Sequence, residues 1–385
     1  MDHVKDMRVL CERGFTLVEL MISLVISSVI VAAGYTILTT THKATISNER
    51  AAGTQQNIRV AMELIARDIK QAGFGMPIVP NTPVGGTVGN CATGATGLTS
   101  VAVRPVDNNS AVPLTDVNDT GADVISVIVP RTNSANGVNP GWVLANQAPS
   151  GGAVSFTTIT LSATAVAEMV AEGMQNSSGA YVSLGGALTV PVLSSSGATI
   201  TLGGNPTYAP KIFPAGTQVY LLQCVTYQVA TGAANCGSAG PCLTRTVDSG
   251  TAPTVTTSLV DGVEDLQFAY GCDGCNSAIN AGVKDGVIDD FNGNSTFDVA
   301  DFQTNRVWAV GTFDPATIRL VQINIVARQT AIDQGTGVGI QSGALSTPIQ
   351  VSDHLASNDA GYVAATYQSF RRRFLTRTVD TRNIQ

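Results

Sequence analysis

Polar and apolar residues are distributed unevenly along the first part of this chain. A single charged side chain, Glu19, occurs in residues 15–38, which read FTLVELMISLVISSVIVAAGYTIL. At about 1.5 Å of rise per residue, a helix over this stretch is roughly 36 Å long, and the hydrocarbon core of a bilayer is about 30 Å thick. The pattern therefore predicts a transmembrane helix over residues 15–38.

The helical pattern continues past this span in amphipathic form, because no proline occurs before Pro77. Apolar residues recur at steps of three and four, which places them on one face of a helix. They are Ile58, Met62, Ile65, Ile69 and Ala72. The other faces are expected to carry Arg59, Glu63, Arg67, Asp68 and Lys70. We predict one helix over residues 15–73, ended by Gly73, Gly75 and Pro77, whose second half packs on a globular partner.

Beyond the helix, β-branched residues alternate with small-residue turns. Partial alternation predicts strands within residues 123–130, 154–162, 199–202, 217–229 and 316–328. Residues 163–174 favour a short helix, and residues 77–122 are expected to be irregular because glycine and proline interrupt them. The predicted fold class is α+β: a long N-terminal helix followed by a large β-rich head over residues 74–385, with a candidate subdomain boundary near residue 210.

Composition argues for a folded head without a nucleic-acid partner. Charged residues make up 13% of the chain, hydrophobic residues 44%, and the formal net charge is −7. A disordered chain would need more charge and less hydrophobicity. Nucleic-acid binding needs a basic surface, and the cationic cluster that stands out is Arg371, Arg372 and Arg373.

The cysteines fit an oxidising compartment. Of the seven in the chain, Cys11 precedes the apolar span, and an even number remains for disulfides. We favour the local pairs Cys236–Cys242 and Cys272–Cys275, which leaves Cys91 with Cys224. The alternative is a four-thiolate metal site built from the two local pairs, although the spacing from Cys236 to Cys242 is wide for a zinc ribbon.

One loop has the oxygen spacing of a calcium site. Counted as a 12-residue calcium loop, its candidate ligands are Asp290, Asn292, Asn294, Thr296 through its carbonyl, Asp298 and Asp301. Ser295 stands at the sixth position, where glycine normally makes the sharp turn, so a calcium loop here requires an unusual backbone. A weak calcium site and an acidic loop held by Asx turns both remain open.

Enzyme signatures are missing from the sequence. It contains no HExxH, GxSxG, P-loop or dinucleotide-binding motif, and its three histidines, His3, His42 and His354, stand far apart. We therefore expect no catalytic residues and no required cofactor, with Ca²⁺ as the one candidate ion.

Glu19 connects the apolar span to a processing motif. A carboxylate within a membrane span is costly unless it has a partner or lies at the headgroup boundary. Residues 11–20, CERGFTLVEL, resemble the cleavage site of type IV prepilins and type II secretion pseudopilins. The resemblance implies a leader over residues 1–14, cleavage after Gly14 by a membrane-embedded prepilin peptidase, and N-methylation of Phe15. The new amine of Phe15 would then pair with Glu19 of its own or a neighbouring subunit.

A narrower resemblance lies near the C-terminus. Residues 259–271, 317–329 and 371–383 resemble the C-terminal pattern of the PilW family of minor pilins. Residues 63–75, ELIARDIKQAGFG, resemble the way in which PilW and its secretion counterpart GspJ leave the N-terminal helix. The Gly-, Ser- and Thr-rich middle of the chain resembles no family.

These resemblances imply a minor pilin that takes part in type IV pilus assembly, in a tip or priming complex. The implied partners are other minor pilins, the major pilin and a tip adhesin. The implied location is the inner membrane of a Gram-negative bacterium, with the head in the periplasm, and then the pilus surface. Two alternatives remain: a type II secretion pseudopilin of the GspJ kind, and a membrane-tethered extracellular binding module or adhesin.

Overall fold

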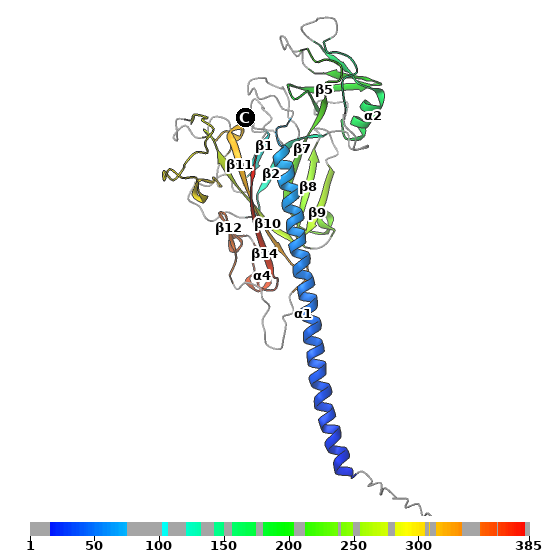
Figure 1. Ribbon diagram of the computed structural model, residues 1–385, viewed down its shortest axis with the longest axis vertical. Helices are drawn as coiled ribbons and strands as arrows, with labels where there is room; N and C mark the ends of the chain where they lie inside the picture. The colour runs from blue at the N-terminus through cyan, green and yellow to red at the C-terminus, as the bar shows by residue number, and fades with distance from the viewer. Residues whose placement is uncertain are drawn as a thin grey trace, which may run out of the picture.

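A computed structural model gives a long helical stalk with a β-rich head at one end (Figure 1). The structure describes residues 16–74, 102–106, 121–131, 142–149, 156–174, 180–203, 212–237, 240–248, 255–275, 282–304, 308, 313–332, 347–359 and 361–381. The leader, Gly14, Phe15 and Cys91 lie outside these ranges.

The stalk is the 55-residue helix α1, Leu17–Gln71. It ends where predicted, because Gly73 adopts a φ of 76°, a conformation open to glycine. The amide of Gly73 donates to the carbonyl of Ile128 at 3.1 Å, and the Phe74 ring packs edge-on against Tyr220 at 5.4 Å. These contacts attach the end of the helix to the head.

The larger sheet of the head is antiparallel and nine-stranded. Its strands are β1 Val103–Val106, β2 Val124–Arg131, β3 Thr158–Thr160, β4 Tyr181–Leu184, β5 Leu188–Ser196, β6 Thr199–Leu202, β7 Val219–Ala230, β8 Cys242–Asp248 and β9 Val255–Asp261. The long strand β7 organises this sheet, since it pairs with β2, β4 and β8. Helix α2, Ala163–Ala171, lies against β6 of this sheet, and helix α3, Ala233–Cys236, lies against β8 and β9.

A second, three-stranded sheet runs in the order β10-β11-β14. Its strands are β10 Val263–Cys272, β11 Ile318–Arg328 and β14 Arg372–Asp380, all antiparallel. The remaining elements are the pair β12 Gln350–Val351 and β13 His354–Leu355, helix α4 Ala364–Tyr367, and the 3₁₀ turns Val299–Asp301, Pro315–Thr317 and Ala356–Asn358. The three segments that resemble PilW therefore come together, since they contain β10, β11 and β14.

The C-terminal half of α1 shares one hydrophobic core with both sheets. Figure 1 shows this half running lengthwise beside the strands of the head, while the N-terminal half extends beyond them. A second cluster of buried residues lies around α2 and β3–β6 and includes Trp142, Phe213 and Leu221. The larger core takes strands from both sides of residue 210, so the two clusters do not divide the chain there; the domain boundaries stay a prediction.

The structure confirms the α+β fold and corrects parts of the strand prediction. Strands β2, β6, β7 and β11 lie within one or two residues of the expected ranges, and α2 fills most of residues 163–174. Of the strand expected at 154–162, the described residues 156–162 hold β3, Thr158–Thr160. Part of the segment expected to be irregular, residues 77–122, is strand β1, whose Val103 is fully buried and paired with Val127 of β2. Burial of one valine beside a long partner strand outweighs the glycines and prolines around it.

Candidate functional site

The N-terminus of α1 forms a capping box between Thr16 and Glu19. The Thr16 amide and hydroxyl donate to Oε2 of Glu19 at 3.0 and 3.1 Å, and the Glu19 amide donates to Oγ1 of Thr16 at 3.2 Å. A carboxylate in the first helical turn also stabilises the positive end of the helix dipole. Glu19 therefore holds the first turn of the helix within this chain. Its pairing with the amine of Phe15 lies outside the described residues and stays a prediction.

The first half of α1 is exposed and apolar. Among the described residues, one helix is long and apolar enough to cross a membrane. None of its most hydrophobic 18-residue segment is buried. Its large apolar side chains are exposed by 54% at Ile22 and by 76% at Leu17. A surface of this kind needs lipid or other helices around it.

Several hydroxyl groups along this half donate hydrogen bonds within the helix. The side chains of Ser23, Ser28 and Thr36 donate to backbone carbonyls three residues earlier, at 2.7–2.9 Å. Such bonds let polar residues lie in an apolar environment without an unsatisfied donor. These hydroxyls therefore add no unsatisfied donor to the apolar surface of the helix.

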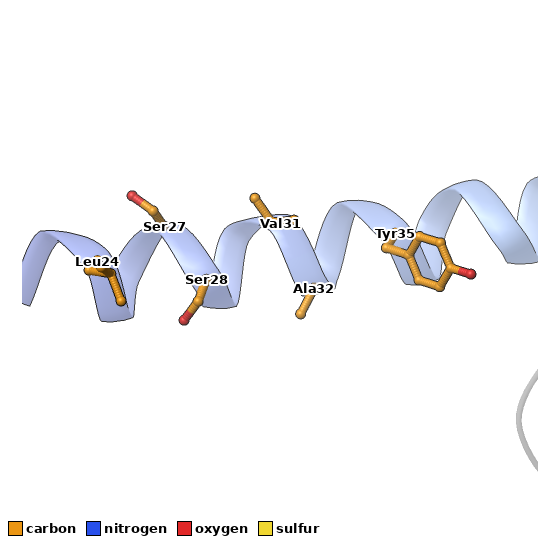
Figure 2. Close-up of a pocket in the computed structure, with 6 residues that line it drawn as sticks. All are labelled: Leu24, Ser27, Ser28, Val31, Ala32 and Tyr35. Atoms are coloured by element: carbon orange, nitrogen blue, oxygen red, sulfur yellow. The ribbon is translucent and has the colours of Figure 1, made fainter.

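A shallow hollow lies on the exposed helix surface (Figure 2). Its lining comes from α1 alone: Leu24, Ser27, Ser28, Val31, Ala32 and Tyr35. Small side chains at this spacing allow a neighbouring helix to approach closely in a membrane. The hollow is therefore better suited to helix packing than to a small ligand.

The second half of α1 packs into the head through the predicted apolar stripe. Ile58, Met62, Ile65, Ile69 and Ala72 are all buried, with exposures of 0–4%. Ala61 and Ala66 are buried as well, which widens the stripe toward the sheets. The same helix is therefore covered by its own chain at one end and uncovered at the other.

Asp68 is buried, although its position in the sequence predicts the polar face of the helix. Its side chain is 3% exposed and accepts the Tyr227 hydroxyl at 2.7 Å and Nε and Nη2 of Arg245 at 3.2 and 3.1 Å. Burial, together with the charge of Asp68 and its hydrogen bond, raises the pKa of Tyr227, so this hydroxyl stays a donor. Partners on β7 and β8 compensate the buried charge, and neither partner lies near Asp68 in the sequence.

The calcium-like loop keeps a tight, internally bonded form. Asp290 accepts the amides of Gly293 and Ser295 at 2.7 and 2.6 Å, and buried Asp301 accepts the amides of Phe291, Asn292 and Asp298 at 2.8–3.3 Å. Ser295 adopts a φ of 63°, the strained conformation expected if the loop makes the sharp turn of a calcium loop.

The amide nitrogens of Asn292 and Asn294 donate to Asp298 at 2.6–3.2 Å. The Asn–Asp298 bonds join side chains, and the Asp290 bonds are of the Asx-turn type. An acidic surface loop makes both kinds without an ion. The six candidate ligands therefore share one loop, and calcium binding stays a prediction.

Both local cysteine pairs form disulfides in the structure: Cys236–Cys242 and Cys272–Cys275. Cys224 is also disulfide-bonded, and Cys91, the expected partner, lies outside the described residues. Beside the second pair, the buried carboxylate of Asp289 accepts the amides of Gly274 and Cys275, each at 3.1 Å. Burial raises the pKa of Asp289, and its charged neighbours Asp273 and Asp285 add to the rise.

His354 connects three separate segments of the head. Its Nδ1 lies 2.8 Å from Asp265 of β10, and its Nε2 lies 2.9 Å from Asp359, which also accepts the Gly121 amide at 2.8 Å. Burial alone lowers the pKa of His354, but the hydrogen bonds and charges of Asp265 and Asp359 outweigh it and raise the pKa to about 10. The sequence shows only an isolated histidine, because Asp265 lies 89 residues away along the chain and nothing marks nearby Asp359 as a partner.

Comparison with known proteins supports both resemblances. The family described as "Type IV Pilus-assembly protein W", PilW, matches residues 226–383, and the family described as "Prokaryotic N-terminal methylation motif" matches residues 10–35. The first match contains the three-stranded sheet, and the second contains Glu19 and the start of the apolar helix. The chain is therefore PilW-like over residues 226–383 and carries the prepilin methylation motif at residues 10–35.

Other comparisons are weaker. A type IV-like pilin from Thermus thermophilus is similar at 13% sequence identity, over 42% of the PilW-like chain and 69% of that protein, with a TM-score of 0.19. A likeness at this level adds nothing to the description of the fold. No curated protein matches the chain significantly.

The methylation-motif match and the apolar helix together support a pilin anchored in a membrane by a single pass. The match to pilus-assembly proteins supports contacts with other pilus components in general.

Proposed function

We propose that this PilW-like pilin acts in a tip or priming complex of a type IV pilus, with the exposed half of α1 packed among the helices of other pilins. One observation carries the proposal: α1 continues without a break from an uncovered apolar half into a half buried in the head. Such a helix can enter a helical bundle and hold the head at a defined position outside it.

The size of the head supports a place at the end of a filament. The head occupies most of a 385-residue chain and extends sideways from the helix in two sheets. A bulky head is difficult to repeat along a tightly packed shaft, but it fits a single position at the tip. Other minor pilins, the major pilin and a tip adhesin are the partners we propose.

Glu19 has two roles in this proposal. In the separate chain it caps the first helical turn with Thr16. In the assembled bundle we propose that it pairs with the N-methylated amine of Phe15 in its own or a neighbouring subunit, after cleavage behind Gly14. Because a charge in a helical bundle needs a counter-charge, this pairing would select for correctly processed subunits. The head would face the periplasm before assembly and the cell exterior afterwards.

The first test is the N-terminus of the protein recovered from its native membrane and from sheared surface filaments. We expect chains that begin at N-methylated Phe15 in both fractions. Chains that keep residues 1–14 would instead support the membrane-tethered binding module.

A matched pair of variants tests assembly itself. Glu19→Gln keeps the size and much of the capping geometry but removes the charge, and Glu63→Gln makes the same change on the exposed face of the helix beside the head. We expect Glu19→Gln to insert normally in the membrane but to disappear from sheared filaments, whereas Glu63→Gln remains in them. Equal recovery of both variants would contradict the assembly role of Glu19.

Partner identity separates pilus from secretion system. Co-purification of cross-linked complexes with the major pilin supports the pilus, whereas complexes with secretion pseudopilins support the GspJ-like alternative.

A further inference from the structure

Strand β14 forms one edge of the three-stranded sheet. It pairs with β11 along its whole length, from Leu320 opposite Asp380 to Arg328 opposite Arg372. On its other side, no strand of the described chain pairs with it. A nine-residue edge strand is long enough to receive a further strand.

The hydrogen bonds at the two ends of the β11–β14 pair show which backbone groups face outward. The amide of Gln329 donates to Arg371 at 3.0 Å, and the amide of Thr381 donates to Arg319 at 2.9 Å. In an antiparallel pair, residues that bond across the pair alternate with residues whose N–H and C=O point away. The odd-numbered residues of β14 therefore bond to β11, and Phe374, Thr376 and Thr378 present their N–H and C=O groups at the outer edge.

The outward-facing residues are accessible. Phe374 is 46% exposed, and Thr376 and Thr378 are exposed as well. The side chains of the odd-numbered residues Val379 and Arg377 lie on the face toward the helix, because Val379 is buried in the main core and Arg377 pairs with Glu63 of α1. The helix thus covers one face of β14 and leaves its outer backbone groups uncovered within the described part of the chain.

This edge is basic in a chain that is acidic overall. Residues 371–380 hold four arginines and one aspartate, whereas the whole chain has a net charge of −7. Arg372 is buried and pairs with Glu264, and Arg377 pairs with Glu63. Arg373 is exposed, and no described residue forms an ion pair with it. Arg373 therefore offers a positive charge at this edge, which a partner strand that carries carboxylates would complement.

We propose that the outer edge of β14 binds an extended, acidic segment of another polypeptide, which adds a strand to the β10-β11-β14 sheet. The N–H and C=O groups of Phe374, Thr376 and Thr378 would bond to its backbone, the Phe374 ring would pack on its side chains, and Arg373 would pair with a carboxylate. This surface is separate from the exposed half of α1, so the proposal does not depend on the bundle described above.

Hydrogen exchange of the full-length chain in detergent micelles tests the geometry first. We expect the amides of Phe374, Thr376 and Thr378 to exchange at least a hundredfold faster than those of Leu375, Arg377 and Val379. Equal protection of both sets would mean that another element already covers the edge, and would overturn the proposal.

Binding is tested with a labelled nine-residue peptide of alternating valine and glutamate, compared with its valine–lysine counterpart by fluorescence anisotropy. We expect the glutamate peptide to bind at least tenfold more tightly and to protect the three outward amides. Thr378→Pro removes one outward N–H and no bond to β11, so it should weaken binding at least tenfold. Its control, Thr378→Val, keeps the N–H and should bind within twofold of the original chain.

A second comparison covers the case in which Thr378→Pro disturbs the fold. A glutamate peptide with alternate backbone nitrogens methylated cannot form the ladder and should lose at least tenfold in affinity for the unaltered chain. Absence of binding, equal binding of the two charged peptides, or indifference to the methyl groups would overturn the proposal; the arginines would then serve to keep other strands away from the edge.

Discussion

The two halves of helix α1 are built from similar apolar residues but meet opposite surroundings. Ile65 and Ile69 are fully buried against the sheets, whereas Ile30 is 65% exposed on the same helix. The acidic residues differ in the same way, since Asp68 is neutralised inside the head by Arg245 and Glu19 only caps its own helix end. The comparison shows that the head buries the apolar side chains of one half of the helix, while those of the other half depend on lipid or on other chains for burial.

The largest expected effect comes from truncating the buried half. Ile65→Ala removes a fully buried side chain and should lower the free energy of unfolding of the head by about 2–5 kcal/mol. The same change at Ile30, which is exposed, should alter it by no more than about 0.5 kcal/mol. Urea unfolding of the full chain in micelles, followed by near-ultraviolet circular dichroism, measures both. Similar losses in the free energy of unfolding for the two variants would contradict the proposed difference between the two halves of the helix.

The buried ion pair should rank next. Asp68→Ala leaves Arg245 and Tyr227 without their shared acceptor, and because Arg245 is a quarter exposed we expect a loss of about 2–3 kcal/mol. Glu63→Ala, which breaks the exposed pair with Arg377, is the matched control and should cost much less. A double-mutant cycle of Asp68→Ala with Tyr227→Phe should be non-additive, because the two side chains share a hydrogen bond. Additivity would show that the network has little energetic importance.

The pH dependence of the stability of the head tests the His354 contacts, which lie in the head and not along the helix. Because folding raises the pKa of His354 from about 6.5 in the unfolded chain to about 10, its contribution is complete below pH 6.5 and is lost as the pH rises to 10. Relative to His354→Gln, the original chain should lose stability across this window, at most about 1.4 kcal/mol per pH unit. Parallel curves for the two proteins would refute a protonated His354 in the folded head.

The smallest expected effect concerns the calcium-like loop. If Ca²⁺ binds there, tenfold excess over Kd should add about 1.4 kcal/mol to the stability of the head, measured as a rise in Tm. Asp290→Asn and Asp301→Asn should abolish the rise, and Mg²⁺ should not replace Ca²⁺ in a loop of this length. A rise that survives both substitutions would place the ion elsewhere, and no rise would leave an Asx-turn loop.

The helix and its stripe could be read from the sequence because a period of 3.6 residues is a local signal. Strands β2, β7 and β11 were also predictable, since they are rich in β-branched residues. Strands β4, β5 and β8 were missed because serine, threonine and arginine hide their alternation.

Asp68 shows the same limit at the level of one residue. Nothing near it in the sequence distinguishes it from Glu63 or Arg67, and its partners Tyr227 and Arg245 lie on strands 159 and 177 residues away. The reverse holds for the calcium-like loop, where the spacing of side chains is visible in the sequence, the structure contains Asx-turn hydrogen bonds, and calcium binding stays a prediction.

The way in which α1 is seated in the head has a mechanical consequence. The buried stripe from Ile58 to Ala72 lies lengthwise along the strands, and the Asp68 ion pair and the Gly73 hydrogen bond hold its far end. A pull along the helix axis therefore loads the interface in shear, with all the contacts sharing the force at once. A sideways pull would open them one after another. The molecule should thus resist tension along its stalk better than bending at the point where α1 leaves the head.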